Sequence, residues 1–409
     1  MQSRSSVILG GSDSLAQAER ILLFGALGML VVSAAVGGSL GLGASSGPAQ
    51  RTHVHAGSLG WLTLAVLAVA LGMVADDDRC PPRSRRLGNR ISWLTVAAVT
   101  AFVLADAAGS ASAEAWTGTA AVAAILAFLA WLAVIGRRAG AAWTVARLAM
   151  AGALAVLMAG SIIGATSAGV GASGNATAAA SLASAHSAAL VVPFVVLATT
   201  SVLEWSVSPS SVPPPLTTAG LVQVGALVLA AVAVITGVLA HNLALVETNI
   251  PLEFGGLAIF LVRVGPLLLA AGWARNSRIW LVLSTVALAV DIGLFAHVVF
   301  EIGRRRYVSI DMVPRWLVFT IDHMTFVAVG TTALFGAIAA LAGQESSHSI
   351  TDALAAGGLV LGLVATAASI GAGSASLEAV FTTVLGVSVL FAIAVASRRV
   401  LAITSPRRT

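Results

Sequence analysis

The sequence contains no lysine, and its single cysteine and single tyrosine leave several chemistries without their usual side chains. Cys80 alone cannot form a disulfide within the chain or a CxxC redox or metal motif. Charged residues make up only 10% of the 409 residues, whereas 58% are hydrophobic. This composition lies outside the range of soluble globular domains. It predicts an all-α integral membrane protein, because a backbone in lipid must satisfy its own hydrogen bonds.

Twelve apolar runs are each long enough to cross a bilayer, which takes about 20 residues of helix. Small residues recur every few positions within them, as close helix packing in lipid favours. We expect the helices near 21–43, 54–75, 91–110, 116–136, 144–171, 177–203, 217–240, 253–273, 279–300, 316–342, 353–372 and 377–396.

The whole chain, 1–409, is predicted to form one membrane domain in two halves. Residues 1–203 hold the first six helices and 217–409 hold the last six. Between them, 204–216 is a proline-rich connection that we place in the cytoplasm.

All 22 basic residues are arginines, and their positions set the predicted orientation. With the amino terminus inside, 16 arginines lie on the inner face, five lie on the outer face, and Arg263 falls within a helix. The positive-inside rule therefore predicts a multi-pass protein of the cell membrane with both termini in the cytoplasm. The net charge of +5 then reflects topology, and we expect no nucleic-acid partner.

Six of the seven histidines fall at one predicted depth, in the outer third of the membrane. Ionisable groups within a membrane are costly and usually functional, and imidazole is a preferred ligand of haem iron and copper. The layer is therefore interpreted as a metal or haem site, against the alternative that its rings only pack or anchor the helices. Its members are His53, His55, His186, His241, His297 and His323, while His348 lies in an inner loop.

The pair His53 and His55 opens the second helix. Positions two apart on a regular helix point about 200° apart. The two rings therefore cannot both bind one metal. They must serve opposite sides of the helix, or one is a ligand and the other its hydrogen-bonding partner.

Histidines near the outer face of the second, sixth, seventh and tenth helices, in a chain of twelve helices, resemble catalytic subunit I of the haem-copper oxidase superfamily. The resemblance implies a subunit I-like bundle with a low-spin haem clasped between the second and tenth helices. It also implies a second haem and a copper or non-haem iron. Implied partners, besides the lipid bilayer, are an electron donor (cytochrome c, a cupredoxin or quinol) and further membrane subunits of a respiratory chain.

The resemblance carries over at four short segments. "HVHAGSLGW" resembles the H-x-H-x-x-x-x-G segments of cbb3-type oxidases and their short relatives, which makes His53 and His55 the candidates on the second helix. We expect His55, deeper in the helix, to be the haem ligand that faces His323 of "FTIDHMTFVAVGTTALFG". "ASAHSAALVVPF" and "GVLAHNLALVE" supply His186 and His241 as ligands of the second metal.

Four departures argue against a complete oxygen-reducing site. Asn242 replaces the second histidine of the family's pair on the seventh helix, and Thr325 stands where a second histidine of the tenth helix would be. The only tyrosine, Tyr307, lies in an outer loop, and no lysine exists to line a family-type proton channel. We therefore expect a divergent member with one haem site and an altered second site.

Five outer arginines contradict the orientation rule. Haem propionates in this superfamily point outward, and the arginine fork suits carboxylates. The alternative is a solvated basic loop that touches lipid headgroups. The candidates are Arg51, Arg304, Arg305, Arg306 and Arg315, with Arg51 and His53 nearest the propionates.

Two opposite charges fall near the middle of adjacent helices. Unpaired, Arg263 and Asp291 would each cost several kcal/mol, so we expect them to form an ion pair. The remaining acids near the outer helix ends are expected to be solvated. These are Asp106, Glu114, Glu247, Glu253 and Glu301.

Three functions remain open from the sequence. The first is a haem-copper oxidase-type oxidoreductase that transfers electrons and reduces O2 or NO at a second metal. The second is a non-catalytic haem- or copper-binding protein in nitric oxide tolerance or cofactor handling. The third is a secondary transporter, for which twelve helices and a charged pair at the midplane are a common layout.

Overall fold

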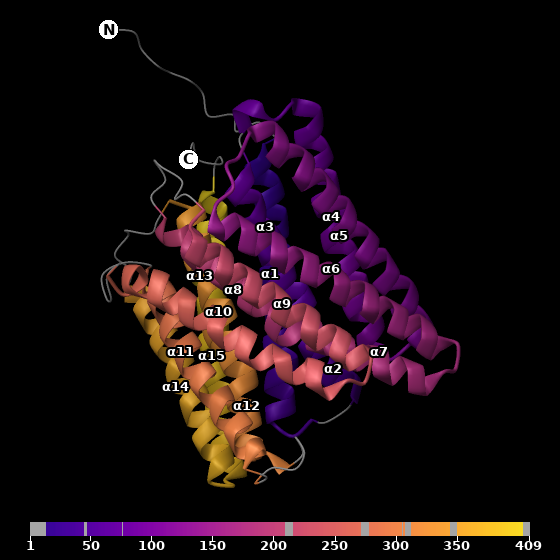
Figure 1. The fold of residues 1–409 in the computed structure, drawn as a ribbon, viewed down its shortest axis with the longest axis vertical. Helices are drawn as coiled ribbons and strands as arrows, with labels where there is room; N and C mark the ends of the chain where they lie inside the picture. The colour runs from indigo at the N-terminus through magenta and orange to yellow at the C-terminus, as the bar shows by residue number, and fades with distance from the viewer. Residues whose placement is uncertain are drawn as a thin grey trace.

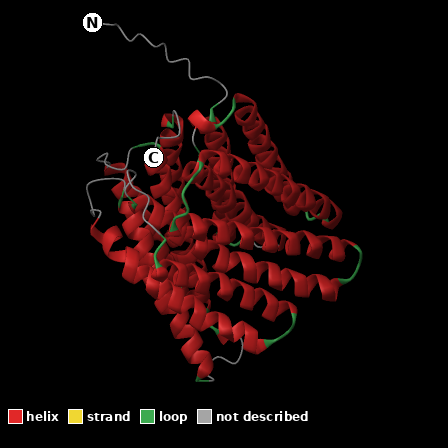
Figure 2. Cartoon of the chain, turned by 45° about the horizontal axis from the view of Figure 1, so that its top comes forward, coloured by secondary structure: helices red, strands yellow, loops and turns green. Residues whose placement is uncertain are grey.

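The computed structural model describes residues 14–44, 47–75, 77–208, 216–270, 278–304, 306, 312–343 and 350–403. Within these residues the chain is helical, without strands (Figure 2), and twelve helices are long and apolar enough to span a membrane. The predicted number of spans is therefore confirmed. Most of the loop at 204–216, together with Arg305, Tyr307 and His348, lies outside the described residues.

We number the spans 1 to 12 in chain order. Nine of them are single helices: α1 (Leu15–Gly41), α4 (Pro82–Ala107), α5 (Ala111–Ala139), α6 (Val145–Ala172), α9 (Thr218–Leu239), α10 (Leu243–Ala270), α11 (Ile279–Gly303), α14 (Ile350–Gly371) and α15 (Ala375–Ala402).

Spans 2, 6 and 10 differ, because a π-helical segment interrupts each. Span 2 consists of α2 (Gly47–His55), η1 (Ala56–Thr63) and α3 (Leu64–Val74). Span 6 consists of α7 (Ala176–Ala189), η3 (Leu190–Phe194) and α8 (Val195–Val207), and span 10 of α12 (Arg315–His323), η5 (Met324–Thr331) and α13 (Thr332–Leu341). These are also the three most buried spans.

Local sequence signals account for several helix ends. The Thr144 hydroxyl accepts a hydrogen bond from the Arg147 N–H at the start of α6, and Gly140 ends α5 with φ of 62°. Two helices begin well before the predicted boundary, α4 at Pro82 and α10 at Leu243. Apolar runs mark only the lipid-facing part of a helix, which continues through polar residues at the membrane surface.

The contacts between the helices divide the twelve spans into three similar units of four that follow one another in a ring. Figure 1 shows α4 and α5 side by side on one flank of the molecule and α11, α14 and α15 together on the other. In each unit the first span packs against the interrupted second span: α1 against span 2, α6 against span 6 and α11 against span 10. The third and fourth spans pair as antiparallel neighbours, α4 with α5, α9 with α10, and α14 with α15. The ring closes because α1 packs along α15.

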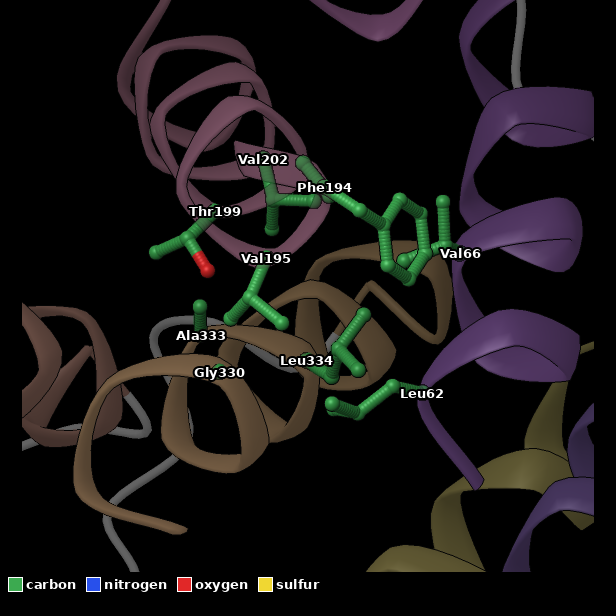
Figure 3. A pocket seen from close by; sticks show the side chains of 10 residues that line it. Leu62, Val66, Phe194, Val195, Thr199, Val202, Gly330, Ala333 and Leu334 are labelled. Carbon is green, nitrogen blue, oxygen red and sulfur yellow. The ribbon is translucent and has the colours of Figure 1, made fainter. Parts of the chain in front are cut away.

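The interrupted spans meet in the core. The indole Nε1 of Trp61 in η1 donates to the Thr331 hydroxyl in η5 at 2.9 Å. Where the π-helical segments end, the three spans enclose a small apolar cavity, which Val66, Phe194 and Leu334 line among others (Figure 3). The ring of outer helices thus holds spans 2, 6 and 10 together, and these are the spans that carry the candidate histidines.

Candidate functional site

The three interrupted spans bring four histidines together as two pairs. The ring centres of His53 and His323 lie 6.4 Å apart with an angle of 23° between the ring planes. Those of His55 and His186 also lie 6.4 Å apart, at 52°. His53 and His55 therefore serve different partners, as their spacing predicted. The expected pairing was wrong, however, because His53 and not His55 faces His323. Spacing fixes the angle between two side chains, but packing fixes how the helix is rotated.

All four rings are held through Nδ1, three of them by a backbone carbonyl. His53 bonds to the Ser33 carbonyl at 2.8 Å, and its Nδ1 also lies 3.2 Å from the Ser33 hydroxyl. His186 bonds to the Gly160 carbonyl at 2.8 Å, and His323 to the Phe319 carbonyl of its own helix at 3.1 Å. A carbonyl can only accept, so Nδ1 donates in these three rings. In the neutral ring Nε2 is then the unprotonated nitrogen, whose lone pair could bind a metal.

Glycines on the preceding span give two of these rings their space. A Cβ on Gly37 of α1 would lie 2.5 Å from Cε1 of His53, and a Cβ on Gly164 of α6 would lie 2.5 Å from Nδ1 of His186. Real Cβ atoms do not approach other atoms that closely. Each ring therefore occupies the space that a side chain at this glycine would fill, and its Nδ1 donates to the carbonyl four residues earlier on the same helix.

His55 differs from the other three because a carboxylate holds it. Its Nδ1 lies 2.9 Å from Oδ2 of Asp106 on α4, and Nε of Arg51 donates to Oδ1 of the same group at 2.9 Å. Arg51 also reaches Glu114 at 3.4 Å. Asp106 is completely buried, so the expectation that it is solvated was wrong. No local pattern marks this residue, because its partners come from another span.

The predicted solvent exposure of two further acidic residues was also wrong. Glu253 and Glu301 are 5% and 6% exposed, although both were expected to be solvated. For Glu253 the cause is the early start of α10 at Leu243, which places the residue inside the span. Glu247 is exposed, as expected.

The remaining residues of the predicted layer do not join the four rings. His241 lies in the exposed turn between α9 and α10, with φ of 50°, and His297 is exposed on α11. Arg304 lies over the Phe300 ring, and Arg306 lies 3.4 Å from Glu301. Arg305 is outside the described residues. Whether the outer arginines bind propionates stays a prediction.

The predicted ion pair between Arg263 and Asp291 is not formed. Arg263 instead pairs with Glu204 of α8 at 2.7 Å and donates to Gln223 of α9 at 2.5 Å. Asp291 accepts a hydrogen bond from the Thr325 hydroxyl at 2.7 Å. Arg263 lies seven residues before the end of α10, whereas Asp291 lies twelve residues into α11, so the two side chains are at different levels of the two helices.

The described residues hold no group of three or more His, Cys, Asp or Glu side chains close enough to bind a metal ion by themselves. What they offer is two pairs of imidazoles, each with ring centres 6.4 Å apart. A scan of protein-family models and a search of curated proteins gave no match to this chain.

Proposed function

We propose that this protein is a membrane haem protein that transfers electrons, with a low-spin haem held between His53 and His323. A haem already holds its iron with the nitrogens of its own ring, so the protein would need to supply only His53 and His323. Two histidines suffice for such a group, whereas a bare metal ion needs three or four protein ligands. The pairwise arrangement of the rings supports haem on this ground.

The separation of the rings is the observation that carries the proposal. Metal–nitrogen bonds of about 2 Å, with each ring centre about 1 Å behind its nitrogen, put the centres of two axial imidazoles about 6 Å apart. The centres of His53 and His323 are 6.4 Å apart. Both Nδ1 atoms are engaged with carbonyls, which is the usual outer-shell arrangement of a ligating histidine.

The surroundings of the pair suit a bound group that must be held rigidly. Gly37 and the Ser33 carbonyl fix His53 from α1, and the Phe319 ring stacks on His323 with 3.9 Å between ring centres. Arg51 stands two residues before His53 and is half exposed, so its guanidinium can reach a propionate while it holds Asp106. When bound, the haem would supply reversible one-electron chemistry.

The position of His241 favours electron transfer or simple haem binding over turnover of O2 or NO. The oxidase-type second metal requires a histidine from the seventh span beside His186, and His241 lies instead in an exposed turn. A non-catalytic haem protein in nitric oxide tolerance or cofactor handling is therefore the second candidate. The transporter hypothesis loses its main support, because Arg263 and Asp291 are not paired at the midplane.

The test is the haem content and spectrum of the purified full-length protein. We expect reduced-minus-oxidised α and β bands, and a low-spin signal that His53→Ala and His323→Ala each remove. His297→Ala is the matched control, because this histidine is exposed on α11 and contacts neither pair. A colourless protein from haem-replete cells would refute the proposal. Turnover with reduced cytochrome c or quinol separates the oxidoreductase from the non-catalytic candidate.

A further inference from the structure

Basic side chains gather at one end of the helical hairpin formed by α4 and α5, which lie side by side on one flank of the molecule (Figure 1). The start of α4 packs against the end of α5, where the indole Nε1 of Trp131 donates to the Ser84 carbonyl at 3.0 Å. Residues 76–90 and 136–140 contain seven arginines and three aspartates. Four of these arginines are exposed and form no ion pair with any described residue: Arg83, Arg90, Arg137 and Arg138.

The two arginines of α4 alternate with leucines on one side of the helix. At 3.6 residues per turn, Arg83, Leu87, Arg90 and Leu94 fall within about 60° of one another, and we call them the Arg–Leu face. Leu87 and Leu94 are 50% and 56% exposed. Trp93, next to Leu94, is 60% exposed, as is typical of a side chain at the membrane interface. The face therefore presents guanidinium groups directly above an exposed apolar surface.

Other arginines at this end of the molecule are used within the protein. Odd-numbered spans begin here and even-numbered spans end here. Arg147, near the start of span 5, donates to the Met73 carbonyl at 2.9 Å. Arg399, near the end of span 12, is buried and pairs with Asp352. The exposed arginines of the α4–α5 hairpin have no such role within the protein and are free to bind an external anion.

We infer that the Arg–Leu face binds an anionic phospholipid, with the phosphate at Arg83 and Arg90 and the acyl chains along α4. The planar fork of arginine donates two parallel hydrogen bonds to a phosphate. Arginine clusters beside a membrane span attract anionic lipids, and Arg137 and Arg138 add to the positive charge at this end. A soluble anion would use the arginines alone, whereas a lipid also covers the two exposed leucines.

The test is lipid binding to the purified, delipidated full-length protein, followed by native mass spectrometry. Phosphatidylglycerol and phosphatidylcholine with the same acyl chains are compared, and we expect a preference for phosphatidylglycerol of at least about tenfold. Arg83→Gln combined with Arg90→Gln should remove this preference. Lysine at both positions should retain part of it, because lysine keeps the charge and loses the fork. Arg398→Gln is the matched control, since Arg398 is exposed at the same end of the molecule on α15.

Further measurements separate a lipid from a soluble phosphate. Leu87→Ala combined with Leu94→Ala should weaken phosphatidylglycerol binding several-fold without a change of charge, and sn-glycerol 3-phosphate should not displace the lipid. All variants should unfold at the wild-type temperature, because these side chains are exposed. Displacement by glycerol phosphate would assign the arginines to a soluble anion and overturn the lipid site. Equal affinity for the two lipids, or an unchanged preference in the variant with glutamine at both arginine positions, would overturn it as well.

Discussion

His53 and His55 are separated by one residue, yet different kinds of partner hold them. His53 is fixed by the backbone of α1, whereas His55 is fixed by the buried carboxylate of Asp106. Each of the two rings therefore has its own support, one from the backbone of α1 and one from a side chain of α4. This difference explains why the i, i+2 spacing, which looks unsuited to a shared metal, is useful when each ring faces a separate partner.

A glycine prediction follows at the scale of single residues. Gly37→Ala should weaken or abolish haem binding by His53 and His323, because the new Cβ would lie 2.5 Å from the His53 ring and push it out of position. The adjacent Gly38→Ala is the control, since no atom lies within 4 Å of a Cβ at that position. Alanine favours helix over glycine by up to about 1 kcal/mol, so the control should fold at least as well as the wild type.

Haem content and thermal stability are measured together for these two variants. Loss of haem in Gly37→Ala without loss of helical signal is the expected result. Full retention of the low-spin signal in Gly37→Ala would show that the position of the His53 ring does not matter for haem binding.

At the scale of elements, the π-helical segments relate the three central spans to one another. Each segment ends eight residues after a histidine: Thr63 after His55, Phe194 after His186 and Thr331 after His323. π-helical turns are rare and often lie at functional sites, because the extra residue re-aims the side chains on one side of it. Each of the three units therefore contains one π-helical segment in its second span. These segments were not predicted, because the hydropathy of a sequence does not distinguish a π-helix from an α-helix.

Deletion of one residue from a π-helical segment tests whether that segment orients the histidines. Deletion of Ser58 from η1 should convert the segment towards a regular helix and rotate α2 by about 100° relative to α3. His53 and His55 would then turn away from His323 and His186, so haem binding should fall while membrane insertion persists. Deletion of Ala44, in the exposed loop before α2, is the control and should leave the haem content unchanged. An unchanged spectrum after deletion of Ser58 would count against a role for the π-helical turn.

At the scale of the whole molecule, buried ion pairs join neighbouring spans whose relative positions hydrophobicity alone does not determine. Glu204 of α8 and Arg263 of α10 are 7% and 18% exposed and also engage Gln223 of α9, so one network ties together spans 6, 7 and 8. Arg399 of α15 and Asp352 of α14 form a second buried pair at 2.5 Å, and Trp280 of α11 donates to the same aspartate. In lipid such pairs replace the hydrophobic driving force between helices.

Loss of a buried ion pair should lower the free energy of unfolding more than loss of an exposed one. Glu204→Gln leaves the Arg263 charge uncompensated and should cost about 3 to 5 kcal/mol. Glu378→Gln removes the partner of Arg315, whose side chain is 76% exposed, and should cost less than about 1 kcal/mol. Thermal unfolding in detergent measures both. Equal transition temperatures for the two variants would show that the Glu204 network does not hold the bundle.

The sequence by itself determined the number of spans and excluded a disulfide within the chain, because apolar length and residue type are properties of the chain alone. The predicted cytoplasmic orientation rests on the same kind of information. Of the six histidines predicted to lie at one depth, the structure brings four together. Only the tertiary structure showed that His53 faces His323, that Asp106 is buried beside His55 and that Arg263 forms its ion pair with Glu204. These contacts depend on how each helix is rotated and how far it slides along its neighbours. A rotation of one position changes the direction of a side chain by about 100° and leaves the hydropathy of the span unchanged.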